Sequence, residues 1–500
     1  MDITMQRSVV RLENGVVRGK AEFGIHAFLG IPYAAPPFGV NRMRPPQPVQ
    51  PWEGERDATA YGPTAPKGDY PPQFAPLFPE VVIPGADCLN LNVWTPEPGV
   101  RGLPVLMWLH GGSFTNGSSS VTEYDGTAFA RDGVVCVTVN YRLGAEGYLF
   151  LDDGTANLGL LDQLAALHWV QDNIAAFGGD PARVTVAGES AGAMSVTTLL
   201  SMPVTEGLFA QAIAQSGATA HTLTSQEAHT VGGYLAEALG VPPDREAIKA
   251  VSMNALVQAA SDLVTEVQTA PDPAKWGRLA LSLLPFAPTL DGSVLSAMPI
   301  DAITAGHGVD VPLLIGSNRD EGRLFLVPTG AIAAIDEPAL ATMAGAYGFA
   351  GNDLAVYRAN RPDGSPGDIL AAVITDWYYR IPAIRVAEAR SAAGATGTWM
   401  YRFDHPEPRA NHGLGACHGA EVPFVFDTIT HPQLHPLLGD APSQTVADRT
   451  HQVWVDFITH GAPGWAPYDT VGRTTGLLTD DIGPVDDPAG DERALWQDIR

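Results

Sequence analysis

A chain of 500 residues is long for one domain, but large α/β enzymes reach this length, and 45% hydrophobic against 17% charged residues allows a large buried core. Its 55 acidic residues and 29 Lys and Arg residues give a net charge of −26, which argues against the basic surface that binds nucleic acid or an anionic membrane. The composition fits a protein that acts on neutral or cationic molecules.

The predicted elements begin with a β-hairpin, because VVRLENGVVRG (9–19) places two short β-runs around an Glu-Asn-Gly turn. Pro-rich loops are expected as far as about Pro84. Apolar, β-branched runs then predict strands at LNVW (91–94), PVLMWLH (104–110) and VVCVTVNY (134–141). A helix is predicted over 157–176, and a strand at VTV (184–186) leads into another predicted helix at 191–200.

The second half of the chain continues this alternation. It predicts strands at 311–318 and 397–403 and helices at 367–390 and 446–460. Alternating strands and helices indicate an α/β fold with a large, mostly parallel central sheet flanked by helices. The acidic segment 479–492, which contains Gly and Pro, is expected to be a surface loop. We find no repeat, linker or charge block, so a single domain over 1–500 is expected.

Targeting and cysteine signals point to the cytoplasm. The start, MDITMQRSVV, lacks the basic and apolar regions of a signal peptide, and no run of about 18 uncharged apolar residues follows. The three cysteines, Cys88, Cys136 and Cys417, are too few and too scattered for a disulfide framework or a zinc site. We expect a cytoplasmic protein without a metal ion.

The junction VTVAGESAGAMS (184–195) contains the pattern G-x-S-x-G. Gly188 and Gly192 stand two residues to either side of Ser190, where the strand and helix backbones come close. This pattern is typical of a nucleophile elbow, which holds a serine hydroxyl at the carboxyl end of a sheet in front of a helix N-terminus. An ordinary serine helix cap shares the local pattern, so the elbow needs partners elsewhere.

A serine nucleophile requires oxyanion donors, a general base and an acid that orients the base. LMWLHGGSF (106–114) places glycines directly after a strand, as the HGGG-type loop of esterases does, although such a loop is also typical of a plain turn. The loop after 311–318 offers Asp320 and Glu321 as the acid, and the residues alone do not choose between them. Among the later histidines, His418 in GLGACHGAEVPFVF stands out because small residues surround it.

Longer motifs carry a resemblance to a known family. FGGDPARVTVAGESAG (177–192) resembles the serine active-site signature of the type-B carboxylesterase and cholinesterase family. Further similar stretches run along the whole chain: FLGIPYAAPP, DCLNLNVWTP, HGGSF, VNYRLGAEGYL, NLGLLDQLAALHWVQDNIAAFGGDP, IAQSGA, GSNRDEGRLF and CHGAEVPFVF. The chain looks most like the bacterial carboxylesterases of that family, which have the α/β-hydrolase fold.

The resemblance implies a serine esterase that uses no cofactor and no metal. Its catalytic triad would be Ser190, Glu321 and His418, with Glu321 preferred to Asp320 because the family's glutamate precedes the glycine of the DEG motif. His418 would be the base, four positions before the VPFVF run.

The resemblance also implies residues around the triad. The oxyanion donors would be the backbone N–H groups of Gly112, Ser113 and Ala191, and the acyl pocket would lie near Phe114. Glu189 and Ser216 match positions near the triad in the family, and for both the alternative is local hydrogen bonding at the elbow and helix start.

One departure from the family pattern and one retained pair affect the structure. The cysteine usual in the segment YGPTAPK is Ala65, so the family's disulfide to Cys88 is not possible, which agrees with a reducing compartment. Arg142 and Asp162 are both retained, and we expect them to form a structural ion pair.

The main hypothesis is therefore a monomeric hydrolase of small, uncharged carboxylic esters, with no nucleic-acid or membrane partner. One alternative is that the same site acts mainly on carbamates or amides. A second is a non-catalytic, cholinesterase-like binding module, although such relatives typically lose a triad member. A third is a peptidase, but nothing in the sequence indicates the additional gating domain that such a peptidase uses.

Overall fold

The computed structural model describes residues 6–350, 353–407 and 410–499. The prediction that the start MDITMQRSVV is not a signal peptide falls partly on residues 1–5, which lie outside the described residues. The chain divides into two compact units. The first comprises Met1–Asp69, Glu80–Ile213 and His221–Ala302, and the second Tyr70–Pro79, Ala214–Ala220 and Ile303–Arg500. Within the described ranges, no helix has the length and apolar character needed to cross a membrane.

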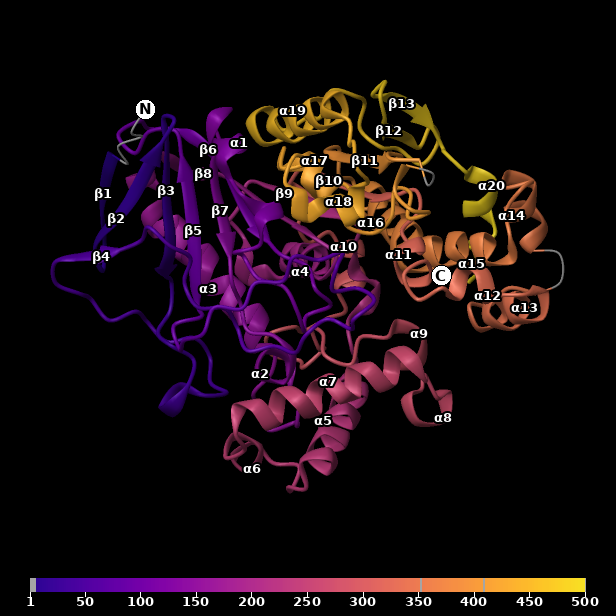
Figure 1. Ribbon diagram of the computed structural model, residues 1–500, viewed down its shortest axis with the longest axis horizontal. Coiled ribbons are helices and arrows are strands. Elements are labelled where there is room, and N and C mark those ends of the chain that lie inside the picture. Colours follow the sequence, from indigo (N-terminus) through magenta and orange to yellow (C-terminus); the bar gives the residue numbers. More distant parts are fainter. Residues whose placement is uncertain (1–5, 351–352, 408–409, 500) are drawn as a thin grey trace. The chain divides into compact units, whose positions relative to one another are not determined.

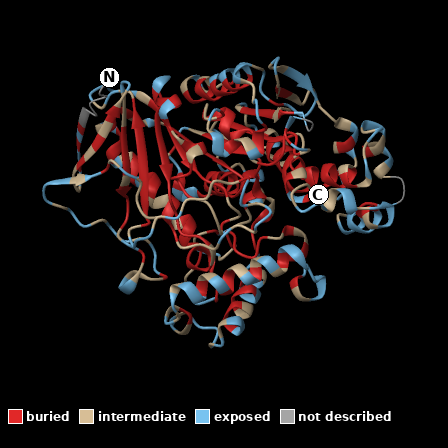
Figure 2. Ribbon diagram, in the orientation of Figure 1, coloured by how far each residue is buried: buried red, intermediate tan, exposed pale blue. Residues whose placement is uncertain are grey.

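The first unit contains a sheet with the strand order β1-β2-β3-β5-β7-β6-β8, and β4 pairs with β2 (Figure 1). From β1 to β7 the neighbours along this path are antiparallel, whereas β6 runs parallel to both β7 and β8. Figure 2 shows β5, β6 and β7 buried along almost their whole length, as their apolar sequences predict. The strands are β1 (Gln6–Leu12), β2 (Gly15–Glu22), β3 (Ile25–Pro32), β4 (Glu55–Asp57), β5 (Asn90–Thr95), β6 (Leu103–Leu109), β7 (Val135–Val139) and β8 (Gly179–Glu189).

Helices of the first unit follow its strands and also form a separate helical region after β8. Leu235 from α5 and Leu256 and Leu263 from α7 are buried in one cluster, so these two helices pack on each other through apolar faces (Figure 1). The helices are α1 (Thr127–Arg131), α2 (Gly144–Tyr148), α3 (Leu158–Asn173), α4 (Ala191–Leu200), α5 (Ser225–Leu239), α6 (Arg245–Lys249), α7 (Met253–Thr269), α8 (Pro273–Trp276) and α9 (Leu279–Ser282).

The strand β9 (Gln211–Gln215) and the helix α10 (Pro299–Thr304) lie where the chain passes from one unit to the other. The second unit contains the strands β10 (Leu313–Asn318), β11 (Thr398–Phe403), β12 (Thr474–Leu478) and β13 (Gly483–Asp486). β10, β11 and β12 are parallel, and β13 is antiparallel to β12. Because β10 and β11 are almost fully buried, the loops at their carboxyl ends start from a rigid base.

The longest helical stretch of the second unit contains a π-turn. Asp376–Arg380 adopts this rare conformation between α15 and α16, and all five of its residues are buried. The predicted helix at 367–390 is therefore present, with one change of winding. The helices of this unit are α11 (Arg323–Leu326), α12 (Ala331–Ala334), α13 (Glu337–Ala346), α14 (Leu354–Asn360), α15 (Pro366–Thr375), α16 (Ile381–Ala392), α17 (Val422–Val425), α18 (His435–Leu438), α19 (Gln444–His460) and α20 (Gly490–Ala494).

Two local predictions are wrong. The Pro-rich region expected to form only loops contains β3, which pairs with β2 and β5 and buries Phe28 and Ile31; tertiary pairing outweighs its local glycine and proline signals. The segment 479–492 is not a simple loop, because it contains β13 and the start of α20. β13 is a largely exposed edge strand, where Pro484 is tolerated and no apolar alternation reveals the strand.

Candidate active site

Ser190 occupies the turn between β8 and α4 in the first unit, as the elbow pattern predicts. Its φ of 55° and ψ of −120° are strained for a residue with a side chain, a conformation that costs on the order of 1–3 kcal/mol and is found mostly at functional sites. A Cβ atom at Gly192 would lie 2.0 Å from the carbonyl oxygen of Leu109, and one at Gly188 would lie 2.6 Å from the carbonyl carbon of Gly192. Both glycines are therefore required for the close approach of strand and helix.

The glycine-rich loop after β6 lies against this elbow within the same unit. A Cβ atom at Gly111 would lie 2.5 Å from Oε2 of Glu189 and 3.1 Å from Cβ of Ser190. The next three residues, Gly112, Ser113 and Phe114, have φ values of 108°, 54° and 60°. The backbone of the predicted oxyanion loop is thus strained at two residues that carry side chains.

Phe114 and Glu189 are both buried in the first unit, in different surroundings. The ring of Phe114 is fully buried and packs edge-on against Tyr148, with a centroid distance of 5.0 Å, in a core cluster that also contains Ala191. Glu189 is 6% exposed. Burial, and to a smaller extent the negative charge of Glu189, raise the pKa of Tyr141. An acyl pocket near Phe114 stays a prediction, since this side chain is part of the core of the first unit.

Glu321 and His418 meet in the second unit. Oε2 of Glu321 lies 2.7 Å from Nδ1 of His418, and Oε1 of Glu321 accepts a 2.7 Å hydrogen bond from the backbone N–H of Asn318. Glu321 is fully buried, while His418 is 7% exposed. The carboxylate is therefore fixed at both oxygens, and it can hold the imidazole with Nδ1 protonated and Nε2 available as a base.

Aromatic rings stand next to this histidine. The rings of Tyr379 and His418 have a centroid distance of 4.5 Å, and Phe325 lies 5.8 Å from His418. Phe325 is 38% exposed, and its ring is nearly parallel to that of Tyr379. These rings restrict the imidazole and provide an apolar surface beside it.

Asp320, the other candidate acid, is engaged elsewhere. Its Oδ2 accepts hydrogen bonds from Nη2 of Arg319 at 2.8 Å and from the backbone N–H of Ala416 at 3.1 Å. This carboxylate therefore fixes the loop that precedes His418 and makes an ion pair with a neighbouring guanidinium.

A second buried carboxyl, Glu421, lies in the same unit and was not predicted from the sequence. Its Oε1 accepts from Nε2 of Gln215 at 3.3 Å and from Oγ of Ser216 at 3.4 Å, and Oε2 accepts from Nδ2 of Asn318. Burial and the nearby charge of Glu321 raise the pKa of Glu421 to about 7. The available signal was one acidic residue inside the apolar run HGAEVPFVF, since a glutamate is almost never fully buried without a partner.

Outside these clusters the structure tests the other sequence expectations. Arg142 and Asp162 form a fully buried ion pair at 2.7 Å, as predicted. Cys88, Cys136 and Cys417 are buried free thiols, and Ala65 is also buried.

The described residues contain no group of three or more His, Cys, Asp or Glu side chains that would hold a metal ion.

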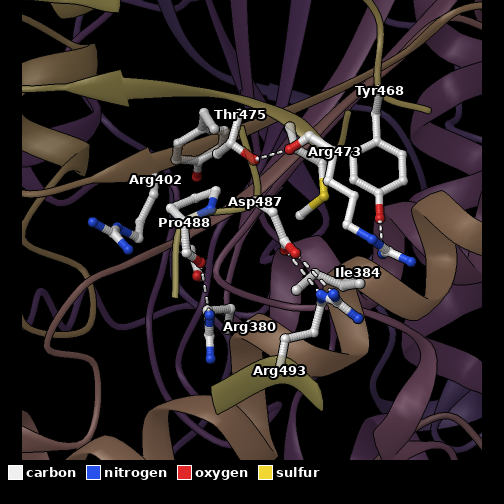
Figure 3. A pocket seen from close by; sticks show the side chains of 12 residues that line it. Arg380, Ile384, Arg402, Tyr468, Arg473, Thr475, Asp487, Pro488 and Arg493 are labelled. Carbon is white, nitrogen blue, oxygen red and sulfur yellow. Dashed lines mark hydrogen bonds and ion pairs between the residues drawn. The ribbon is translucent and has the colours of Figure 1, made fainter. Parts of the chain in front are cut away.

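A pocket in the second unit is lined by four arginines, which are labelled in Figure 3. Each of the four is paired with a carboxylate: Arg380–Asp376, Arg402–Asp404, Arg473–Glu388 and Arg493–Asp487. Its positive charges are therefore offset by acidic side chains of the same unit.

Comparisons with known proteins show which family the chain belongs to. The Carboxylesterase family profile matches residues 6–345 and 352–475. The chain is 37% identical over 510 residues to para-nitrobenzyl esterase of Bacillus subtilis, covering 98% of each protein. It is 35% identical over 467 residues to phenmedipham hydrolase of Pseudarthrobacter oxydans, covering 91% of each. The solved structure of carboxylesterase EST55 from Geobacillus stearothermophilus matches with a TM-score of 0.85 at 34% identity, over 98% of this chain and 100% of that one.

These similarities confirm the α/β-hydrolase fold and carboxylic ester hydrolysis as the class of activity, and they do not favour the binding-module or peptidase alternatives. The chain belongs to the Carboxylesterase family.

Proposed function

We propose that the chain hydrolyses small, uncharged esters with Ser190 as nucleophile, His418 as general base and Glu321 as the acid that orients the base. The observation that carries the proposal is the 2.7 Å contact between Glu321 and Nδ1 of His418, in a chain whose only G-x-S-x-G elbow holds Ser190 in a strained turn. The serine and the other two residues belong to different compact units, so the proposal also treats 1–500 as one catalytic domain.

In the proposed reaction, His418 takes the hydroxyl proton as Ser190 attacks the ester carbonyl. Glu321 stabilises the imidazolium, and the N–H groups of Gly112, Ser113 and Ala191 stabilise the oxyanion. His418 then gives the proton to the departing alcohol. Water activated by the same histidine releases the acid from the acyl-enzyme and restores Ser190.

The proposed substrate class follows from the surroundings of the two clusters. The rings of Tyr379 and Phe325 beside His418 favour an apolar alcohol group, because that histidine protonates the leaving alcohol. One relative is named for para-nitrobenzyl esters, which agrees with an apolar alcohol. Rates for esters of one acid with alcohols of increasing apolar size, measured beside a matched amide and carbamate, test this choice. Faster cleavage of the carbamate or amide would favour the alternative activity.

We propose a cytoplasmic location, which the three buried free thiols support. A disulfide at Cys88 found by peptide mapping without reductant would contradict it. We also propose that the enzyme acts as a monomer, which sedimentation at micromolar concentration would test; a concentration-dependent dimer would contradict it.

The oxyanion assignment predicts opposite results for substitutions at Ser113. If this residue contributes only its N–H, Ser113→Gly and Ser113→Ala should keep kcat within a few-fold. Ser113→Pro removes the N–H and cannot adopt the φ of 54°, so kcat should fall by at least roughly 10²-fold. Steady-state kinetics on one p-nitrophenyl ester measure all three. A large loss in Ser113→Ala at unchanged KM would assign the hydroxyl as the donor instead.

Glu421 predicts a shift in the pH profile. Its pKa of about 7 means that it is neutral at acid pH and charged above neutrality, where its negative charge stabilises the imidazolium of His418. Glu421→Gln removes that charge, so His418 should lose its proton more easily. The acid limb of kcat/KM should therefore move to lower pH, by less than about half a unit, because Glu421 is mostly neutral in the pH range where a histidine titrates. Asp320→Asn is the control, since Arg319 already neutralises that carboxylate. An acid limb that moves to higher pH would contradict the coupling.

A further inference from the structure

The ion pair between Lys67 and Glu80 binds both the carbonyl and the N–H group of Gly117, just beyond the proposed oxyanion loop. Nζ of Lys67 lies 2.6 Å from Oε1 of Glu80, and the two side chains are only 1% and 15% exposed. Lys67 donates a 2.8 Å hydrogen bond to the carbonyl oxygen of Gly117, whose N–H donates a 3.1 Å bond to Oε2 of Glu80. All three residues lie in the first unit.

Gly117 is connected to the oxyanion loop by close backbone contacts. The carbonyl of Gly112 accepts from the N–H of Asn116 at 2.8 Å, and the side chain of Asn116 donates to the carbonyl of Gly68 at 2.7 Å. A Cβ atom at Gly117 would lie 2.5 Å from the carbonyl oxygen of Gly111, and one at Gly112 would lie 2.2 Å from that of Asn116. The backbone atoms between Gly111 and Gly117 are closely packed, so a displacement of Gly117 would also displace Gly111 and Gly112.

The backbone strain of the loop explains what the Lys67–Glu80 ion pair contributes. Ser113 and Phe114 have positive φ, and such strain, on the order of 1–3 kcal/mol per residue, persists only where the surroundings hold it. A buried ion pair adds little net stability compared with apolar side chains, because both charges lose their hydration. Burial lowers the pKa of Lys67, while Glu80 opposes that shift. The contribution of this pair is therefore directional: it fixes where the Gly117 backbone lies.

We propose that Lys67 and Glu80 are positioning residues that hold the oxyanion loop in its strained geometry by clamping Gly117. They act through the loop on the N–H groups of Gly112 and Ser113. This inference rests on the proposed function, which assigns those groups to the oxyanion.

The test separates binding of the oxyanion from binding of the substrate. Oγ of Ser190 adds to the carbonyl carbon of a trifluoromethyl ketone while His418 takes the hydroxyl proton, and the adduct carries an oxyanion. The matching methyl ketone stays mostly unreacted and therefore reports binding of the ground state. Lys67→Met should lower kcat and the affinity for the trifluoromethyl ketone in parallel, by about 10- to 100-fold, since a shift of about 1 Å at a catalytic group costs up to this much. KM and the affinity for the methyl ketone should change less than about two-fold. Lys67→Arg, which keeps the charge and donors, should restore most of the loss.

A matched control is present in the chain. Lys275 and Glu266 also form a Lys–Glu ion pair at 2.6 Å, with half-exposed side chains on α8 and α7, and Lys275→Met should change neither kcat nor either affinity. If Lys67→Met does not fold, Glu80→Gln is measured instead: it removes the ion pair with Lys67 but keeps an acceptor for Gly117, so it should give a smaller loss of kcat and of trifluoromethyl ketone affinity, again in parallel. An unchanged kcat, or an equal loss of affinity for both ketones, would overturn the inference. A wild-type chain that hydrolyses no ester would instead contradict the proposed function.

Discussion

Ser190→Ala is expected to lower kcat by about 10⁴-fold or more while leaving the fold intact, and His418→Ala should have a comparable effect. The serine is held in a strained turn at the start of α4, where its hydroxyl is the proposed attacking group and has no substitute. Rates on a p-nitrophenyl ester and the melting temperature of each variant measure the two parts of this expectation. A residual rate within ten-fold of wild type would remove Ser190 from the mechanism.

A fluorophosphonate probe tests the same assignment by covalent labelling. It should modify Ser190 stoichiometrically, and His418→Ala should slow the labelling because no base activates the hydroxyl. Ser195 on the same helix provides a matched control: it is fully buried and accepts a hydrogen bond from Gln163, so Ser195→Ala should leave labelling unchanged. A label mapped to any other serine, or no label on folded protein, would contradict the elbow as the catalytic site.

Local signals predict the parts of the fold in which sequence pattern and burial coincide. The strand β6 is a continuous apolar run buried on both faces. The glycines around Ser190 are required because a Cβ atom at Gly192 or Gly188 would lie only 2.0 or 2.6 Å from backbone atoms. β3 and β13 were missed because their pairing, rather than their own residues, makes them strands. The helices α5 and α7 were also not predicted, although both begin with side-chain caps, at Thr224 and Ser252.

The candidate site divides in the same way. The oxyanion loop and the elbow are each contiguous motifs, so the sequence places them without long-range information. The pairing of Glu321 with His418 joins residues 97 positions apart and was inferred only from the family resemblance. The Lys67–Glu80 pair has no motif, and Glu421 is marked only as an acidic residue inside the apolar run HGAEVPFVF. Their roles depend on which backbone group lies within hydrogen-bond distance, and this is set only when the tertiary structure forms.

Glu321→Gln is expected to lower kcat by about 10⁴-fold, as happens when a triad acid becomes its amide, because the contacts of Glu321 determine how the new side chain must lie. One carboxylate oxygen accepts from the N–H of Asn318, so the amide oxygen of glutamine takes that position and its NH₂ group faces Nδ1 of His418. Nδ1 must then be unprotonated to accept this hydrogen bond, which places the imidazole proton on Nε2. In that tautomer the histidine cannot take the proton of Ser190.

Asp320→Asn should be much milder, within about ten-fold of wild type in kcat. The amide oxygen still accepts from Arg319 and from the N–H of Ala416, and Arg319 keeps its ion pair with Glu407. Kinetics on the same ester at a pH above the acid limb compare the two variants, and their melting temperatures show whether either loses its fold. If Asp320→Asn were the severe variant and Glu321→Gln the mild one, Asp320 would be the triad acid. The 2.7 Å contact between Glu321 and His418 would then serve only to anchor the ring.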